Sequence, residues 1–196
     1  MPREGESEPP HMPGIPSLGG GDTFDEQDTF VPEHLPEPGS FLNDVEILTG
    51  DDHIEVHRMA REVFEERGVY DVTFGYNLAK LNRDTRHPDA GFRYARDPDD
   101  PSILLAEFTP TTEFCPQGDS LAVGAFRAFN GECDTHEFDC VKVRVDEILN
   151  ESALVNQRLQ ALEEHFVETG DVRHDLGLGT DEDGEVSTER GTELPF

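Results

Sequence analysis

The sequence contains no tryptophan and only two lysines, Lys80 and Lys142, among its 196 residues. Basic side chains are scarce altogether, with 15 Lys and Arg against 44 Asp and Glu, and the formal net charge is −29. A chain this acidic repels phosphate groups, which excludes nucleic acids and anionic membrane surfaces as partners. Abundant acid with little lysine predicts a halophilic archaeon, whose molar salt shortens the Debye length to about 3 Å. An acidic interaction protein from an ordinary cell is the alternative.

Long apolar runs are also missing. No stretch approaches the 18 residues of a transmembrane helix, and the N-terminal residues MPREGESEPPHMPG have no apolar signal-peptide core. Three cysteines make an odd number without a disulfide pattern, so the thiols are expected to be reduced. These absences predict a cytoplasmic protein. Neither of the glycine-rich nucleotide fingerprints is present, and no Ser/His/Asp set indicates an enzyme.

Composition divides the chain into three parts. Residues 1–45 and 170–196 are rich in Pro, Gly, Asp and Glu and are predicted to be disordered arms. Residues 46–169 alternate between helical and strand patterns, which predicts one compact α/β (α+β) domain. We expect two layers, with about three helices against a small mixed sheet of about four strands.

Hydrophobic periodicity places the elements of this domain. Helices are predicted at residues 51–67, 119–129 and 151–166, and strands at 70–81, 91–95, 102–109 and 138–146. The strands at 91–95 and 102–109 flank the sequence RDPDDP, which is typical of a turn. The residues predicted to face the core from the three helices are Ile54, Val56, Met59, Ala60, Val63 and Phe64; Leu121, Val123, Ala125, Phe126 and Phe129; and Leu154, Val155, Leu159, Leu162 and Phe166.

Cys115 stands between a predicted strand and a predicted helix, in the stretch EFTPTTEFCPQGDSLAVGAFRAF. A helix N-terminus presents unpaired N–H groups that favour the thiolate, which is the reactive and metal-binding form of cysteine. Pro116 fixes the chain at the turn, and Gly118 allows close approach of the backbone. The alternative is a small buried cysteine, and the acidic neighbours Glu113 and Asp119 favour it.

Three other groups of residues are candidate metal ligands. Cys133, His136 and Cys140 have the spacing C-x2-H-x3-C, which is an incomplete zinc pattern, and one packed cysteine with two loop residues is the alternative. His53 and His57 share a helix face, where a solvated polar face is the expected alternative to a metal pair. Calcium ligation by RDPDDP competes with a plain turn, which its two prolines favour.

Residues 102–167 resemble a known family, the small iron–sulfur cluster assembly domain of the eukaryotic cytosolic iron–sulfur targeting factor and of bacterial SufT-type proteins. Three pieces carry the resemblance in order: FTPTTEFCPQGDSLAVGAFRAF with its Thr-Pro-Thr turn and single cysteine, the alternating strand FDCVKVRVD, and the helix ALVNQRLQALEEHF. Residues 1–95 have no counterpart in it.

The resemblance implies a compact α/β fold and a factor, not an enzyme, that helps to deliver iron–sulfur clusters to apo-proteins. Cys115 would be the functional thiolate and transient cluster ligand, and the supporting loop comprises Thr109, Pro110, Thr111, Pro116, Gly118 and Asp119, with Thr112 beside them. No stably bound cofactor is expected, because one thiolate leaves a cluster under-ligated.

Expected partners are iron–sulfur apo-proteins and assembly factors, and the oligomeric state stays open, with a dimer as one option. Two other functions remain: an acidic adaptor in which Cys115 is structural, and a thiol-based redox protein.

Overall fold

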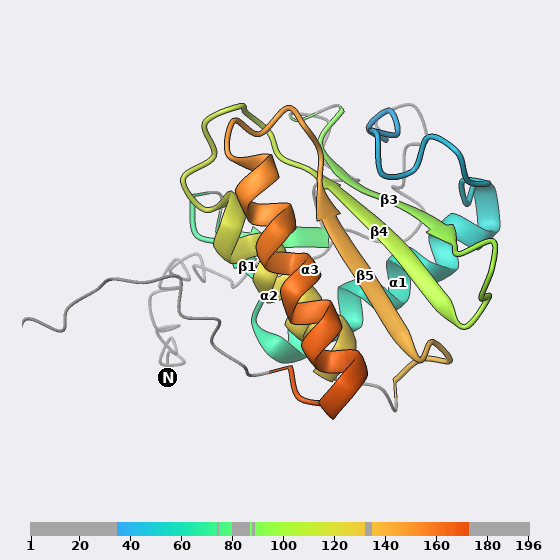
Figure 1. The fold of residues 1–196 in the computed structure, drawn as a ribbon. Helices are drawn as coiled ribbons and strands as arrows, with labels where there is room; N and C mark the ends of the chain where they lie inside the picture. Colours follow the sequence, from blue (N-terminus) through green and yellow to red (C-terminus); the bar gives the residue numbers. More distant parts are fainter. Residues whose placement is uncertain (1–34, 74, 80–86, 88, 132–134, 173–196) are drawn as a thin grey trace, which may run out of the picture.

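The computed structural model describes residues 35–73, 75–79, 87, 89–131 and 135–172. The element order is α1 (Gly50–Arg67), β1 (Tyr70–Asp71), β2 (Tyr76–Asn77), β3 (Gly91–Arg96), β4 (Ile103–Thr109), α2 (Gly118–Gly131), β5 (Cys140–Val145) and α3 (Ser152–Thr169) (Figure 1). This is the expected α+β fold with helices packed on a small mixed sheet. Within the described residues, no helix is long and apolar enough to cross a membrane.

The principal sheet has the strand order β3-β4-β5. β3 and β4 form an antiparallel hairpin, whereas β5 lies parallel to β4 after the crossover through α2. Because β4 and β5 are parallel, the loops that follow them emerge at the same end of the sheet, and α2 and α3 both begin there (Figure 1). The stretch predicted as one strand at 70–81 instead forms the short antiparallel pair β1-β2, with Gly75 at a positive φ between them.

One face of the sheet and the apolar faces of the three helices form the main core. Aromatic rings link its layers: Phe92 stacks on Phe108 at 5.1 Å between ring centroids, and Phe129 contacts Phe64 edge-on at 5.0 Å. All predicted core positions of α2 are buried. The prediction for α3 is wrong at Leu154, which is exposed, and the stripe begins at Val155 instead.

The opposite face of the sheet is covered by residues 35–48, which we call the N-terminal strap. Leu42 of the strap is buried against Ala95 and Leu105, and Ile47 forms an antiparallel bridge with Ala95 on β3. The prediction of disorder is therefore wrong for residues 35–45, because these residues complete a second, smaller core. The predicted arms at 1–34 and 173–196 lie outside the described residues.

The free edge of β5 is closed by two asparagine side chains. The Asn130 amide accepts from the Val141 N–H at 2.8 Å and donates to the Val141 carbonyl at 2.9 Å. Asn156 repeats this arrangement at the other end of the strand, accepting from the Val145 N–H at 2.7 Å and donating to its carbonyl at 2.8 Å. Unpaired edge groups would otherwise offer a template for strand addition, so the two amides block that route.

The histidine pair on α1 is buried, contrary to the expectation of a solvated polar face. His57 Nε2 lies 2.7 Å from the Ala79 carbonyl, which can only accept, so this nitrogen carries the proton. In the neutral ring, Nδ1 then accepts from the Tyr94 hydroxyl at 3.0 Å. Burial raises the pKa of Tyr94 well above its ordinary value, which keeps the phenol protonated and able to donate. The two histidines occupy core positions that the sequence assigned to Ile54 and Met59, which are only partly buried.

Candidate functional site

Cys115 lies in the connection between β4 and α2, three residues before Gly118, where the helix begins. The Gly118 N–H donates to the Cys115 carbonyl at 3.1 Å, which closes a tight turn directly before the helix. The Cys115 side chain is half-buried and packs against the edge of the main core. The predicted position at a helix N-terminus is confirmed, with one side of the residue toward solvent and one toward the core.

Two neighbouring segments hold this connection in place. The Gln117 side chain donates to the Thr73 hydroxyl at 2.7 Å and accepts from the Val72 N–H at 3.3 Å. On the other side, the Asn150 N–H donates to the Glu113 carbonyl at 3.1 Å. The turn after β1 and the β5–α3 connection therefore meet at the Cys115 loop, although they are far apart in sequence.

Gly118 and Asp119 anchor the start of α2 against α3. A Cβ on Gly118 would lie 2.8 Å from Leu149 Cδ2, so any larger residue at this position would require the Leu149 side chain to shift. Asp119 pairs with Arg158 of α3 at 2.6 Å, which offsets part of the acidic charge close to the thiol. Gly118 and Asp119, two members of the predicted supporting loop, therefore fix the position of α2 relative to the β5–α3 connection and α3.

The threonine and proline positions of the loop differ in exposure. Thr109 and Pro110 are buried at the end of β4, whereas Thr112 and Pro116 are exposed. Among the residues that the structure describes, the buried Thr109 hydroxyl has no hydrogen-bond partner, so no side-chain hydrogen bond of Thr109 orients the loop there. Thr111 is partly buried.

Large apolar side chains are exposed on the Cys115 loop and on the segments that meet it. Phe114, adjacent to Cys115, is 77% exposed, and Val72, in the turn held by Gln117, is 78% exposed. Ile148 and Leu154, from the β5–α3 connection and the first turn of α3, are also exposed. These four are among the five large apolar side chains exposed in the described part of the chain, and the fifth is Val167. We call Val72, Phe114, Ile148 and Leu154 the apolar rim, which is typical of a surface that contacts another protein.

The predicted metal-binding groups receive no support from the geometry of the described residues. In this part of the chain no three His, Cys, Asp or Glu side chains gather in a way that could hold a metal ion. Cys140 is buried in β5, and His136 Nε2 contacts the Phe129 carbonyl at 2.8 Å, while Cys133 lies outside the described residues. The packed-cysteine interpretation is confirmed for Cys140.

The acidic turn between β3 and β4 is a plain turn, as its prolines indicate. The Asp97 carboxylate accepts from the Asp99 N–H at 3.0 Å and from Lys142 at 3.3 Å, and these donors hold its pKa below the usual range. The Asp100 carboxylate accepts from the Ser102 N–H at 3.0 Å. Two of the three carboxylates in the turn, those of Asp97 and Asp100, therefore accept from backbone or lysine donors.

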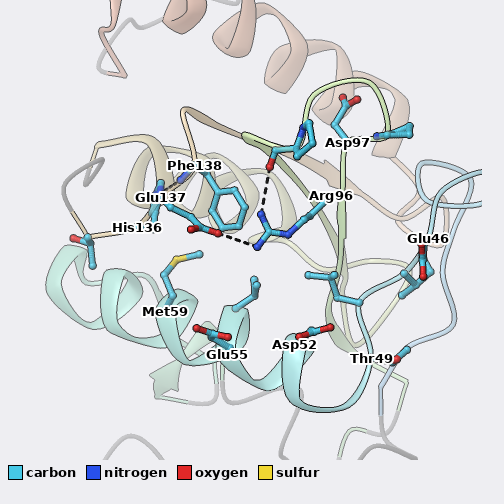
Figure 2. Close-up of a pocket in the computed structure, with 16 residues that line it drawn as sticks. Glu46, Thr49, Asp52, Glu55, Met59, Arg96, Asp97, His136, Glu137 and Phe138 are labelled. Atoms are coloured by element: carbon cyan, nitrogen blue, oxygen red, sulfur yellow. Dashed lines mark hydrogen bonds and ion pairs between the residues drawn. The ribbon is translucent and has the colours of Figure 1, made fainter.

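A groove of about 800 Å³ lies at the opposite end of β4 from Cys115, between α1 and the loop before β5 (Figure 2). Its polar lining is mainly acidic, and Arg96 crosses it, stacked 4.9 Å from the Phe138 ring centroid and paired with Glu137 at 2.9 Å (Figure 2). The acidic side chains that line it are Glu46, Asp52, Glu55, Asp97 and Glu137. Its arginine is already engaged, and the thiol lies elsewhere, so the groove and the Cys115 loop are separate features.

Glu107 is a buried carboxylate that the sequence analysis did not select. It accepts from the backbone N–H groups of Gly39 and Phe41, the latter at 3.2 Å, and so joins β4 to the N-terminal strap. Burial raises the pKa of Glu107, an effect that the two N–H donors oppose. The sequence feature that could have identified Glu107 is an acidic residue within the otherwise apolar strand sequence ILLAEF.

The sequence matches the family described as a domain of unknown function (DUF7998) over residues 22–173. The chain belongs to this family. No curated protein and no solved structure gives a significant match. The DUF7998 match begins before the strap and ends after α3, so it includes the strap, the Cys115 loop and the groove of Figure 2 in one family unit.

Proposed function

We propose that this DUF7998 protein is an iron–sulfur cluster assembly or targeting factor that contacts client proteins through the Cys115 loop. The observation that carries the proposal is a half-buried thiol just before α2, in a loop where the segments that expose the apolar rim meet. The order β4, Thr-Pro-Thr turn, Cys115, α2, β5 and α3 is the order that the resemblance to the assembly family implies. The cluster is cargo in this proposal, not a resident cofactor.

The chemistry assigns separate roles to the thiol and to the rim. Thiolates are the usual protein ligands of iron–sulfur clusters, and a single one leaves ligand positions for the client protein. The apolar rim supplies contact area for that client, because exposed Phe and Val side chains lose water on association. Contact would bring the client's own ligands to the cluster before Cys115 releases it.

The same geometry supports a second function, an acidic adaptor in which Cys115 only packs. Cys115 contacts the main core, and the apolar rim would serve an adaptor equally well. The two functions differ in whether partner binding requires the sulfur or only the rim.

The test is anaerobic capture of partners in molar salt by wild type, Cys115→Ala and Phe114→Ser. A delivery factor loses iron–sulfur proteins or their assembly factors with either substitution. Val167→Ser is the matched control, because it removes an exposed apolar side chain from the C-terminal half of α3. It should leave capture unchanged.

Two outcomes contradict cluster delivery. If Cys115→Ala keeps every partner and Phe114→Ser loses them, the protein is an adaptor with a structural cysteine. If neither substitution changes the captured set, the Cys115 loop is not the partner surface at all.

A further inference from the structure

A second groove, of about 490 Å³, lies between the C-terminal half of α1, the turn after β1 and the outer face of α2. Gly124 and Ala128 line it on α2, where small side chains leave room, and Arg67 and Arg127 provide its charge. None of the described residues that line it is acidic, although the chain carries 44 Asp and Glu. We call it the arginine groove.

The arginine groove and the groove of Figure 2 differ in the charge of their lining residues. That groove is lined by five carboxylates and one arginine, whereas the arginine groove has two arginines and no carboxylate among its described lining residues. An arginine guanidinium forms paired hydrogen bonds with a carboxylate, so the arginine groove suits an acidic ligand. Tyr70, Gln117 and Ser120 add further polar groups to its lining.

The chain itself supplies an acidic ligand that begins at this groove. Val172 is the last described residue, and its side chain lines the groove, with Cγ2 3.4 Å from the position a Cβ on Gly131 would take. Arg67 donates to the Gly131 carbonyl at 2.8 Å, so the end of α2, Arg67 and the departing chain meet here. The 24 residues after Val172 carry seven Asp and Glu against two Arg.

We propose that the acidic run at residues 181–185, DEDGE, binds within the arginine groove of the same molecule. Eight residues separate the run from Val172, and an extended chain of that length spans up to about 30 Å, which is ample for any part of the groove. Covalent attachment keeps the run at a high effective concentration. In molar salt only charges in direct contact interact strongly, and guanidinium–carboxylate pairs meet that condition.

The proposal is independent of the function of Cys115 but places the bound segment beside it. Gln117 and Ser120 line the groove and belong to the turn that starts α2, directly after the Cys115 loop. A bound C-terminal segment would therefore cover one flank of that loop.

The experiment is NMR on the isotope-labelled full chain in molar salt. It follows the side-chain Nε–H signals of Arg67 and Arg127 and the relaxation of the backbone amides at residues 181–185. We expect restrained amides in the wild type, loss of that restraint in Arg67→Gln/Arg127→Gln, and shifted arginine signals when the run is neutralised as D181N/E182Q/D183N/E185Q. The matched control neutralises four acids near the other end of the chain, as D22N/D25N/E26Q/D28N, and should leave the arginine signals in place.

The tail variant keeps the groove intact, so the test does not depend on the folding of the arginine variant. Amides at 181–185 that relax as a free chain in the wild type would overturn the proposal. So would equal responses of the arginine signals to both neutralised variants. If the wild-type run is free but an added DEDGE peptide shifts the arginine signals, the groove serves an acidic partner in trans and docking within the chain is refuted.

Discussion

His53 should make the protein lose stability as the pH falls from neutral. Its side chain is fully buried on α1, stacked on His57 with 5.7 Å between ring centroids and 5.1 Å from the Tyr94 ring. Burial, together with the nearby His57 and Arg93, lowers the pKa of His53 from 6.5 to about 3. The folded protein therefore keeps this ring neutral at pH values where the unfolded chain protonates it.

The sign follows from proton binding. Between pH 6.5 and about 3 the unfolded state holds a proton that the folded state lacks, so the free energy of unfolding decreases as the pH falls through this window. Above pH 6.5 His53 is neutral in both states, so the free energy of unfolding is not reduced by its protonation. At 1.36 kcal/mol per pH unit, this one residue lowers the free energy of unfolding by about 2 kcal/mol at pH 5, compared with pH 8.

The measurement is urea unfolding at pH 8 and pH 5, at constant molar salt, for wild type, His53→Phe and His53→Gln. Neither replacement titrates, so each variant should lose about 2 kcal/mol less than the wild type between the two pH values, whatever its stability at pH 8. Carboxylates titrate in all three proteins and cancel in the difference. Equal losses in the three proteins would refute the assignment of a buried, neutral His53.

Other substitutions test the packing around the site. Asn130→Ala leaves the buried N–H and carbonyl of Val141 unpaired and should cost about 2–6 kcal/mol in urea unfolding, at about 1–3 kcal/mol for each unsatisfied group. Asn156→Ala should cost less because its site is partly exposed, and a larger loss there would contradict the account of the β5 edge. Gly118→Ala forces a Cβ against Leu149 and should cost about 1–3 kcal/mol, with partial recovery when Leu149→Ala is added; no recovery would rule out that contact as the cause. Cys140→Ser places a hydroxyl in the core and should lower the melting temperature, so an unchanged value would count against the burial of this residue in β5.

The sequence determined the elements whose pattern is local. The alternation in CVKVRV and the apolar spacing of α2 specify a strand and a helix through the geometry of the backbone alone, and both lie where they were predicted. The acidic prolines between β3 and β4 likewise predicted a turn, because Pro and Asp favour it without help from distant residues. The position of Cys115 before α2 followed from these neighbours.

Tertiary structure decided what depends on a partner from elsewhere in the chain. His53 and His57 look polar in sequence, yet they are buried because Tyr94 and the Ala79 carbonyl give their helix face ring contacts and hydrogen bonds. Leu154 looks apolar but lies in the first turn of α3, outside the stripe that contacts the sheet.

The strap and the apolar rim show the same division. Residues 35–45 have no periodicity, and they are ordered because Glu107 accepts two of their N–H groups while Leu42 fills a gap against β3 and β4. The rim around Cys115 arises from three connections that only the folded chain brings together. Local pattern reports the conformation of a segment, whereas burial and site assembly depend on which distant surface meets it.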